Sequence, residues 1–135
     1  MGVEYSVAQS KINEIARQCG NDTVKQTASY FGFLAHHSPN SLWFEIFDGL
    51  GFYFGNKAKT HFNLCEIAIV KEKQNRGYGT ALLKRIKNIC KENNINTITL
   101  RARKGSPAEK WWRSRGGVIT GSSKDGKDWK MEIRF

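Results

Sequence analysis

The spacing of hydrophobic residues changes along the chain, and each change predicts a different kind of secondary structure. Residues 7–19 place apolar side chains near helical spacing and are followed by a glycine and an asparagine, which predicts a first helix that stops there. Residues 23–36 fit a second helix, although the stretch SYFGFLA within them fits a strand equally well. The pair Pro39-Asn40 then predicts a turn.

After this turn the pattern becomes that of strands. The segments LWFEIF and GFYFGN, joined by an Asp-Gly turn, predict two antiparallel strands, and HFNLCEIAIV predicts a longer third strand. Residues 77–93 return to helix, with apolar side chains on one face and lysine and arginine largely on the other. NINTITLRA predicts a buried strand, and residues 106–115 predict a helix with Pro107 in its first turn. The segments GVITGSS and DWKMEIRF predict two strands that pair around residues 124–127. We therefore expect an α/β fold with a mixed sheet.

Length and composition restrict the class of protein. A chain of 135 residues is long enough for one domain and too short for two, and it has no internal repeat or linker, so we expect residues 1–135 to form a single domain. No apolar stretch approaches the ~20 residues of a spanning helix, and the start MGVEYSVAQSK lacks the apolar region of a signal peptide, which predicts a cytoplasmic protein with no membrane partner. Cys19, Cys65 and Cys90 never form a C-x-x-C pair, so we expect reduced packing residues and no metal site.

Positive charge is concentrated in the second half of the chain. Residues 1–70 carry five Lys/Arg against six Asp/Glu, whereas residues 71–135 carry seventeen against six, so the excess behind the net charge of +10 lies entirely there. Such a field attracts phosphate-bearing partners and repels polycations. The alternative interpretation is a basic surface that only keeps the protein soluble.

The segment EIAIVKEKQNRGYGTALLKRI, residues 66–86, carries the clearest chemical signal. An apolar strand is followed by a short polar loop, and a long helix begins at Gly77 and Gly79. Glycines let a backbone approach a ligand without a Cβ in the way, and the first amides of the helix point unpaired into the same space, so a pyrophosphate fits there. The segment lacks the G-x-x-x-x-G-K-[ST] of a P-loop, and Leu82 stands where a dinucleotide fingerprint needs its third glycine. It matches instead the pattern Q/R-x-x-G-x-G/A, through Gln74 and the two glycines.

This loop resembles the acetyl-CoA pyrophosphate loop of the GNAT acetyltransferase superfamily. The resemblance continues in SPAEKWWRSRGG, which is similar to a later helix of that family with an alanine, an aromatic pair and a glycine at fixed spacing; those places hold Ala108, Trp111, Trp112 and Gly116. The two motifs stand about thirty residues apart with a strand between them. The resemblance implies that residues 61–135 form the acetyl-CoA-binding part, and residues 1–60 the variable substrate-side part, of one N-acetyltransferase domain.

The same resemblance implies a GNAT-like mixed sheet, splayed at its centre and flanked by helices, with acetyl-CoA in the V between two parallel strands. Backbone groups on the strand before the loop would hold the pantetheine arm, namely those of Ile67, Ala68 and Ile69. The loop would surround the pyrophosphate with Gln74, Asn75, Arg76, Gly77, Tyr78, Gly79 and Thr80. Ser106 and Trp112 would close the thioester side. The alternative role is core packing for the isoleucine side chains and a solvated surface for Arg76.

The resemblance also implies direct transfer, in which a primary amine attacks the thioester in a ternary complex without an acyl-enzyme. An amine with a pKa of about 10.4 costs roughly 4.6 kcal/mol to present uncharged at pH 7, so a general base or a water path must help. Family members commonly place that base nine or eleven residues ahead of the position that Gln74 matches, and here those places hold Cys65 and Asn63. Glu66 is the nearby carboxylate, but strict alternation turns it to the opposite face of the strand unless a bulge returns it to the cleft. His61 lies on the face of Asn63 and is the second candidate base.

Trp112 departs from the family pattern. Many family members have a tyrosine there that donates a proton to the departing thiolate, whereas an indole N–H donates a hydrogen bond but is no acid. A thiol with a pKa of about 8.5 still leaves tolerably well, so activity does not require that tyrosine. Packing is the alternative role for at least one of Trp111 and Trp112.

The sequence leaves the amine acceptor open. A protein lysine or N-terminus is the first expectation. The basic second half favours contact with a nucleic acid or a nucleic-acid-bound protein, so an enzyme that acts on nucleic acid or aminoacyl-tRNA is the alternative. Aromatic residues among positions 42–54 would stack on bases if exposed, but they fit core packing better. A third interpretation is a degenerate module that binds CoA without turnover, and a homodimer is also open.

Overall fold

Three helices open the computed structural model, which describes residues 3–135 of the chain. They are α1 (Val3–Arg17), α2 (Asp22–Ala28) and α3 (Tyr30–His37). The predicted helix over residues 7–19 is confirmed, and so is the helical character of residues 23–36; only the expectation of a single uninterrupted helix there is wrong. Ser29 divides that segment, and its hydroxyl donates to the Gln26 carbonyl at 2.7 Å, the kind of bond by which serine competes with helix backbone. The strand alternative is wrong as well, because the segment buries residues at helical spacing, Phe31, Leu34 and Ala35.

Six strands form one mixed sheet. In chain order they are β1 (Leu42–Phe47), β2 (Gly51–Lys57), β3 (Phe62–Ile69), β4 (Thr97–Arg103), β5 (Val118–Ser122) and β6 (Asp128–Arg134). Their spatial order is β1-β2-β3-β4-β6-β5. Strands β1 to β3 are antiparallel, as are β4, β6 and β5, whereas β3 and β4 are parallel and joined through α4 (Tyr78–Glu92). The expected α/β fold with a mixed sheet is confirmed.

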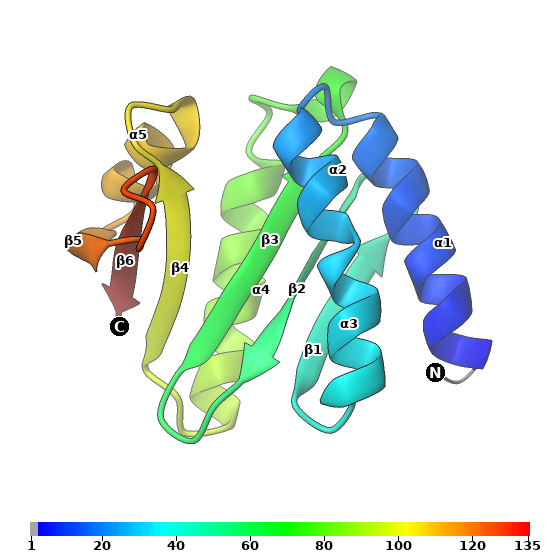
Figure 1. Ribbon diagram of the computed structural model, residues 1–135, viewed down its shortest axis with the longest axis horizontal. Helices are drawn as coiled ribbons and strands as arrows, with labels where there is room; N and C mark the ends of the chain where they lie inside the picture. The colour runs from blue at the N-terminus through cyan, green and yellow to red at the C-terminus, as the bar shows by residue number, and fades with distance from the viewer. Residues whose placement is uncertain (1–2) are drawn as a thin grey trace.

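The sheet opens between its two central strands. Strands β3 and β4 are in register only at Phe62 with Ile98 and at Asn63 with Thr99. Beyond these pairs the two backbones move apart toward the loop that precedes α4, as Figure 1 shows. The expected splay at the centre of the sheet is therefore confirmed, and we call this opening the V.

Helices cover both faces of β1–β3. Figure 1 shows α1–α3 in front of these strands, and they enclose a core that includes Ile12, Phe31 and Phe54. On the opposite face α4 buries an apolar stripe, and this second core includes Phe62 and Leu83. Helix α5 (Pro107–Ser114) adds an aromatic side chain to the second core. These strands are consequently fixed from both sides.

Strands β4, β6 and β5 are covered on one face only. The residues of β4 that point toward α4 are apolar and buried, Ile98, Leu100 and Ala102. The residues between them belong to the other face, where the register sets Arg101 opposite Lys130 and Arg103 opposite Asp128. No helix lies in front of this face in Figure 1. The outward face of β4 and β6 is thus polar and open, whereas β5 adds the exposed Val118 opposite Glu132.

The three cysteines are free thiols. Cys19 and Cys90 are buried, and burial raises the pKa of each thiol to about 11, so both are neutral packing groups at neutral pH.

Within residues 3–135, no helix combines the length and the apolar character that crossing a membrane requires.

Candidate functional site

The loop between β3 and α4 presents backbone amides to open space. After β3 the chain forms a short 3₁₀ turn, η1 (Lys71–Lys73), and residues 74–77 then lead into α4. Asn75 and Gly77 take left-handed backbone angles there, with φ of 62° and 86°. Gly77 is the N-cap of α4, and a Cβ added to it would meet no atom within 4 Å. The unpaired amides of the first turn of α4 therefore border space that an anionic group can occupy.

Gln74 fixes this loop against the rest of the protein. Its side-chain amide donates to the carbonyl of Ile69 at 2.8 Å and to the carbonyl of Cys19 at 3.1 Å. One acceptor is the last residue of β3 and the other follows α1. The Gln74 side chain thus has a structural role, and its direct contact with a pyrophosphate stays a prediction.

Helix α5 closes over the first turn of α4. The Trp111 indole lies so near Gly79 that a Cβ on Gly79 would come within 3.2 Å of the Trp111 Cζ2 atom. The Arg115 guanidinium lies over the same indole, 4.4 Å from the ring centroid, and donates to Thr80 Oγ1 at 2.8 Å. Its Nε atom is buried and has no hydrogen-bond partner among the described residues. A cation with a spare donor therefore stands beside the loop amides.

The edge of β3 that faces β4 is free along the V. The amide of Val70 donates to the carbonyl of Leu50, just before β2, at 2.8 Å, so this residue points its backbone toward β2. Residues of an antiparallel pair alternate between bonding the partner and facing away, so the backbone groups of Ile67 and Ile69 face β4 and those of Ala68 face β2. The Ile69 carbonyl already accepts from Gln74, and the Ile67 amide donates to Glu66. Of the groups expected to hold a pantetheine arm, the geometry therefore favours the Ile67 carbonyl and the Ile69 amide.

A β-bulge changes which face of β3 carries Glu66. Glu66 lies opposite Phe54 in β2, but Leu64 lies opposite the next residue, Gly55, so Cys65 is an extra residue in β3. Leu64 packs into the core on the α4 side. Without the bulge Glu66 would share that face; with it, Glu66 turns toward the helices on the other side of the sheet.

The Glu66 carboxylate is half-buried beside the free edge of β3. Its Oε1 accepts a hydrogen bond from the Ile67 amide at 3.1 Å. Burial raises the pKa of Glu66 to about 7, although hydrogen bonds with the Ile67 amide and with Thr27 of α2 lower it. A carboxyl group with this pKa exchanges protons near neutral pH, as a general base must.

A polar cluster lies where β3 and β4 part. Asn63 Nδ2 donates to Asn56 Oδ1 at 3.0 Å, and Asn63 Oδ1 accepts from Thr99 Oγ1 at 3.1 Å. The Cys65 thiol lies 3.8 Å from the same Asn56 oxygen. Burial and the nearby Glu66 charge raise the pKa of Cys65 to about 12, so it is a neutral thiol and a poor nucleophile. Asn63 and Cys65, the places in which the resemblance implies a base, thus supply neutral polar groups at the base of the V.

Three further predicted residues lie away from the free edge of β3. His61 precedes β3, at the end where the two strands are paired, and its Nδ1 lies 3.3 Å from Thr60 Oγ1. Trp112 is 6% exposed and packs in the core on the α4 side, which is its alternative role. The Ser106 Oγ caps α5 by accepting from the Glu109 amide at 3.2 Å. Substrate contacts of these three residues stay predictions.

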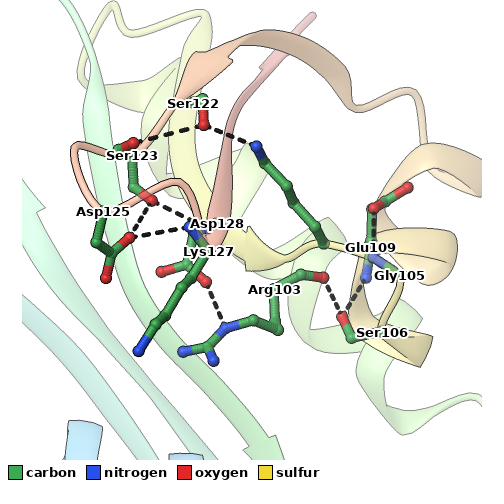
Figure 2. A network of polar contacts seen from close by, with 10 residues as sticks. Arg103, Gly105, Ser106, Glu109, Ser122, Ser123, Asp125, Lys127 and Asp128 are labelled. Atoms are coloured by element: carbon green, nitrogen blue, oxygen red, sulfur yellow. Dashed lines mark hydrogen bonds and ion pairs between the residues drawn. The ribbon is translucent and has the colours of Figure 1, made fainter.

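Figure 2 shows the polar network that holds the end of β4 against α5 and the β5–β6 turn. Ser106 donates to the Arg103 carbonyl at 2.6 Å, and the Arg103 guanidinium pairs with Asp128 at 2.8 Å. In the turn, the Lys127 amide donates to Asp125 at 3.0 Å, and this bond holds the pKa of Asp125 below its ordinary range. The network fixes α5, and with it Trp111, beside the loop.

A surface hollow of about 430 Å³ lies elsewhere, at the C-terminal end of α3. Residues of the α3–β1 turn and the end of β2 line it, among them His37, Pro39 and Lys57. This is the end of the sheet opposite the loop before α4 (Figure 1), so the hollow adds nothing to the site.

Within residues 3–135, no three His, Cys, Asp or Glu side chains gather where they could hold a metal ion.

Sequence reasoning missed several residues of this site. Arg115 follows Trp111 by four positions, a spacing that places both on one side of α5, and this was a usable signal. Asn56 and Thr99 gave no such signal, because they meet only through the pairing of β2, β3 and β4.

The sequence of this chain matches the model of a known protein family. Residues 12–116 match the model of the Acetyltransferase (GNAT) family, which is most of the chain. No curated protein matches the sequence.

Solved structures share the fold at low sequence identity. The chain is similar to the PaiA N-acetyltransferase of Thermoplasma acidophilum in complex with coenzyme A, with 14% identity, 96% of this chain and 94% of that chain covered, and a TM-score of 0.76. For the ribosomal-protein-S18-alanine N-acetyltransferase of Escherichia coli the identity is 15%, the coverage 96% and 88%, and the TM-score 0.70. For a GNAT family acetyltransferase of Elizabethkingia anophelis with acetyl-CoA bound, the identity is 16%, the coverage is 76% of this chain and 82% of that chain, and the TM-score is 0.61. The chain therefore belongs to the GNAT family of acetyl-CoA-dependent acetyltransferases.

Proposed function

We propose that this protein transfers the acetyl group of acetyl-CoA to a primary amine by direct attack, and that Glu66 is the general base. The observation that carries the proposal is the joint position of three features. The loop amides open α4, the V begins beyond Asn63 and Thr99, and the bulge sets a carboxyl group with a pKa of about 7 beside the V.

The loop and the free edge of β3 supply the binding site for acetyl-CoA. Backbone amides from Asn75 to Thr80 would hold the diphosphate, and the spare Nε donor of Arg115 adds a cation next to them. The Ile67 carbonyl and the Ile69 amide would pair with the amides of the pantetheine arm, much as a neighbouring strand would. Acetyl-CoA is a substrate here, and it supplies the activated acetyl group.

Glu66 would act on the acceptor. A protonated amine gives its proton to the Glu66 carboxylate, and the neutral amine then attacks the thioester carbon. A C–N bond forms and the C–S bond breaks, so the electron pair leaves on sulfur. The attacking nitrogen then loses its second proton to water, and the Glu66 carboxyl returns its own proton to solvent before the next turnover. Asn63 and Thr99 lie at the base of the V and would orient the acceptor through their amide and hydroxyl groups. Since Trp112 is buried and is no acid, we expect the thiolate to take its proton from water.

The acceptor class is the least constrained part of the proposal. A protein lysine or N-terminus is our first expectation, and one structural relative is named for acting on a ribosomal-protein alanine. That relative is 15% identical to this chain, so its acceptor is not carried over.

The test is acetyl transfer by the purified protein to a panel of amines, followed by mass spectrometry of the products. The panel contains a lysine-rich peptide, a peptide with a free N-terminus, a polyamine and RNA. We expect acetyl-CoA consumption matched by product in at least one arm, and its loss in Glu66→Gln. Protection against heat unfolding by acetyl-CoA without any product would instead identify a module that binds CoA without turnover.

A further inference from the structure

The outward face of β4, β6 and β5 carries a positive charge that the acetyl-transfer site does not use. The register of β4 and β6 determines which residues lie on this face. They are Thr97, Thr99, Arg101 and Arg103 from β4 and Asp128, Lys130, Glu132 and Arg134 from β6. The arginines and the lysine are exposed. No helix lies in front of β4 and β6 on this side in Figure 1. We call this surface the β4–β6 face.

Arg101 and Lys130 stand directly opposite each other at the centre of this face. Opposed residues of an antiparallel pair have Cα atoms roughly 4.5–5.5 Å apart, and like charges in such positions destabilise a sheet. Neither side chain forms an ion pair with another described residue. A bound anion would neutralise this repulsion.

The flanking arginines are held only by exposed ion pairs. Arg103 pairs with Asp128 at 2.8 Å and Arg134 with Glu132 at 3.2 Å, and the arginine side chains are 58% and 80% exposed. Ion pairs of this kind contribute little stability in water. Both guanidinium groups can therefore exchange a carboxylate for another anion, and a phosphate fits their planar fork especially well.

The basic surface continues into the β5–β6 turn. Lys127 and the neighbouring Lys124 lie at the end of the face, and Figure 2 shows Asp125 turned inward to Ser123 and the Lys127 amide. The acidic side chain of the turn is therefore occupied within the turn. At the other side the face reaches Thr99, which borders the V.

We propose that the β4–β6 face binds the phosphate backbone of a nucleic acid. Its register positions hold no aromatic residue, so the contacts would go to phosphates and not to stacked bases, and the binding would have little sequence preference. The net charge of +10 extends the attraction beyond the face itself, which suits a partner with regularly spaced charges better than a short acidic peptide. This binding does not require that the proposed acetyl transfer occurs.

The test measures fluorescence anisotropy of a labelled single-stranded RNA and of a labelled DNA duplex, over a series of salt concentrations. We compare the wild-type protein with the double variant Arg101→Gln/Lys130→Gln and with a matched control, Lys87→Gln/Lys91→Gln, which removes the same charge from α4 on the other side of the sheet. We expect the wild type to bind at least one probe with an affinity that falls steeply with salt. The β4–β6 variant should bind about tenfold or more weakly and show a salt slope reduced by about 2, whereas the control keeps most of the affinity.

Other outcomes overturn the proposal. Absence of binding to both probes at low salt contradicts it, and so does an equal loss in the two double variants, which would indicate net charge alone. Displacement of the probe by polyglutamate at equal charge concentration would show a surface for any polyanion. A shift from dimer to monomer in the β4–β6 variant during sedimentation would identify a subunit interface. Acetyl-CoA titration of the same variants reports separately on the proposed enzyme, because none of the four residues lies at the loop.

Discussion

Strands β1–β3 lie between helices on both faces, whereas β4, β6 and β5 lie under helices on one face only. The covered half has buried aromatic residues on both sides of its strands, Phe54 toward α1–α3 and Phe62 toward α4. The open half has apolar residues on one side and arginine and lysine on the other. The first half thus supplies strands packed from both sides, the second half supplies an open surface, and the V lies at the boundary between them.

The boundary also explains how a buried carboxyl group comes to lie at the V. Glu66 belongs to the covered half, so burial raises its pKa, although the hydrogen bond with Thr27 of α2 lowers it. It stands beside the strand edge at which the sheet opens, which is the position that the proposed role as general base requires. Neither half alone provides a group that is both desolvated and accessible.

The largest expected effect breaks the chemistry at this boundary. Glu66→Gln should lower kcat/KM by roughly 10²–10⁴-fold, because the amide cannot accept the proton of the amine. The wild-type pH profile should rise through about pH 7, where the Glu66 carboxyl ionises, and this limb should disappear in the variant. Glu72→Gln on the exposed turn η1 is the matched control and should keep the wild-type profile. A wild-type profile in Glu66→Gln would remove it as the base.

The second effect tests the rigidity of the covered half. Phe54→Ala should destabilise the fold by about 3–5 kcal/mol, since the side chain is fully buried and leaves a cavity. Arg101→Gln on the open face should change stability by less than about 0.5 kcal/mol. Urea unfolding of both variants measures the contrast, and equal losses would contradict the difference between the two halves.

The third effect is a pH-dependent stability. Glu66 has a pKa of about 7 in the folded protein against an ordinary value of 4.5, so the folded state binds more protons between these values and wild-type stability falls as the pH rises through them. Glu66→Gln has no such group. Its stability relative to the wild type should therefore increase by about 3 kcal/mol from pH 4 to pH 8. Urea unfolding at both pH values measures this, and a constant difference would show that burial does not perturb the carboxyl group.

The fourth effect tests the loop. Gly79→Val should raise the KM for acetyl-CoA about tenfold or more, because its side chain crowds Trp111 and enters the space beside the loop amides. Ala81→Val introduces the same β-branched side chain at an exposed position of α4 and is the control for helix propensity. An unchanged KM in Gly79→Val would show that the diphosphate binds elsewhere.

The smallest effect concerns the ion pairs of the open face. Arg134→Gln should cost less than about 0.5 kcal/mol, because its pair with Glu132 is exposed. Thermal unfolding of Arg134→Gln and Phe54→Ala measures the two losses of stability side by side. A cost above about 1 kcal/mol would mean that the open face contributes to the stability of the fold.

Local signals made much of this fold predictable. The helix of residues 77–93 follows from its apolar stripe, and the loop follows from the glycines that open it. The division at Ser29 was not predictable from periodicity, because α2 and α3 keep one apolar face across it. The bulge at Cys65 depends on the register between two strands, so the sequence of β3 alone left Glu66 on either face. Trp111 and not Trp112 is the tryptophan next to the loop, and the way α5 packs determines which of the two lies there.

Calorimetric titration of the purified protein with acetyl-CoA is the decisive experiment for the binding site at the loop. We expect saturable binding at one site, weakened about tenfold in Gly79→Val and unchanged in Arg101→Gln/Lys130→Gln. No heat of association up to millimolar acetyl-CoA, under conditions in which the protein is folded, would contradict it.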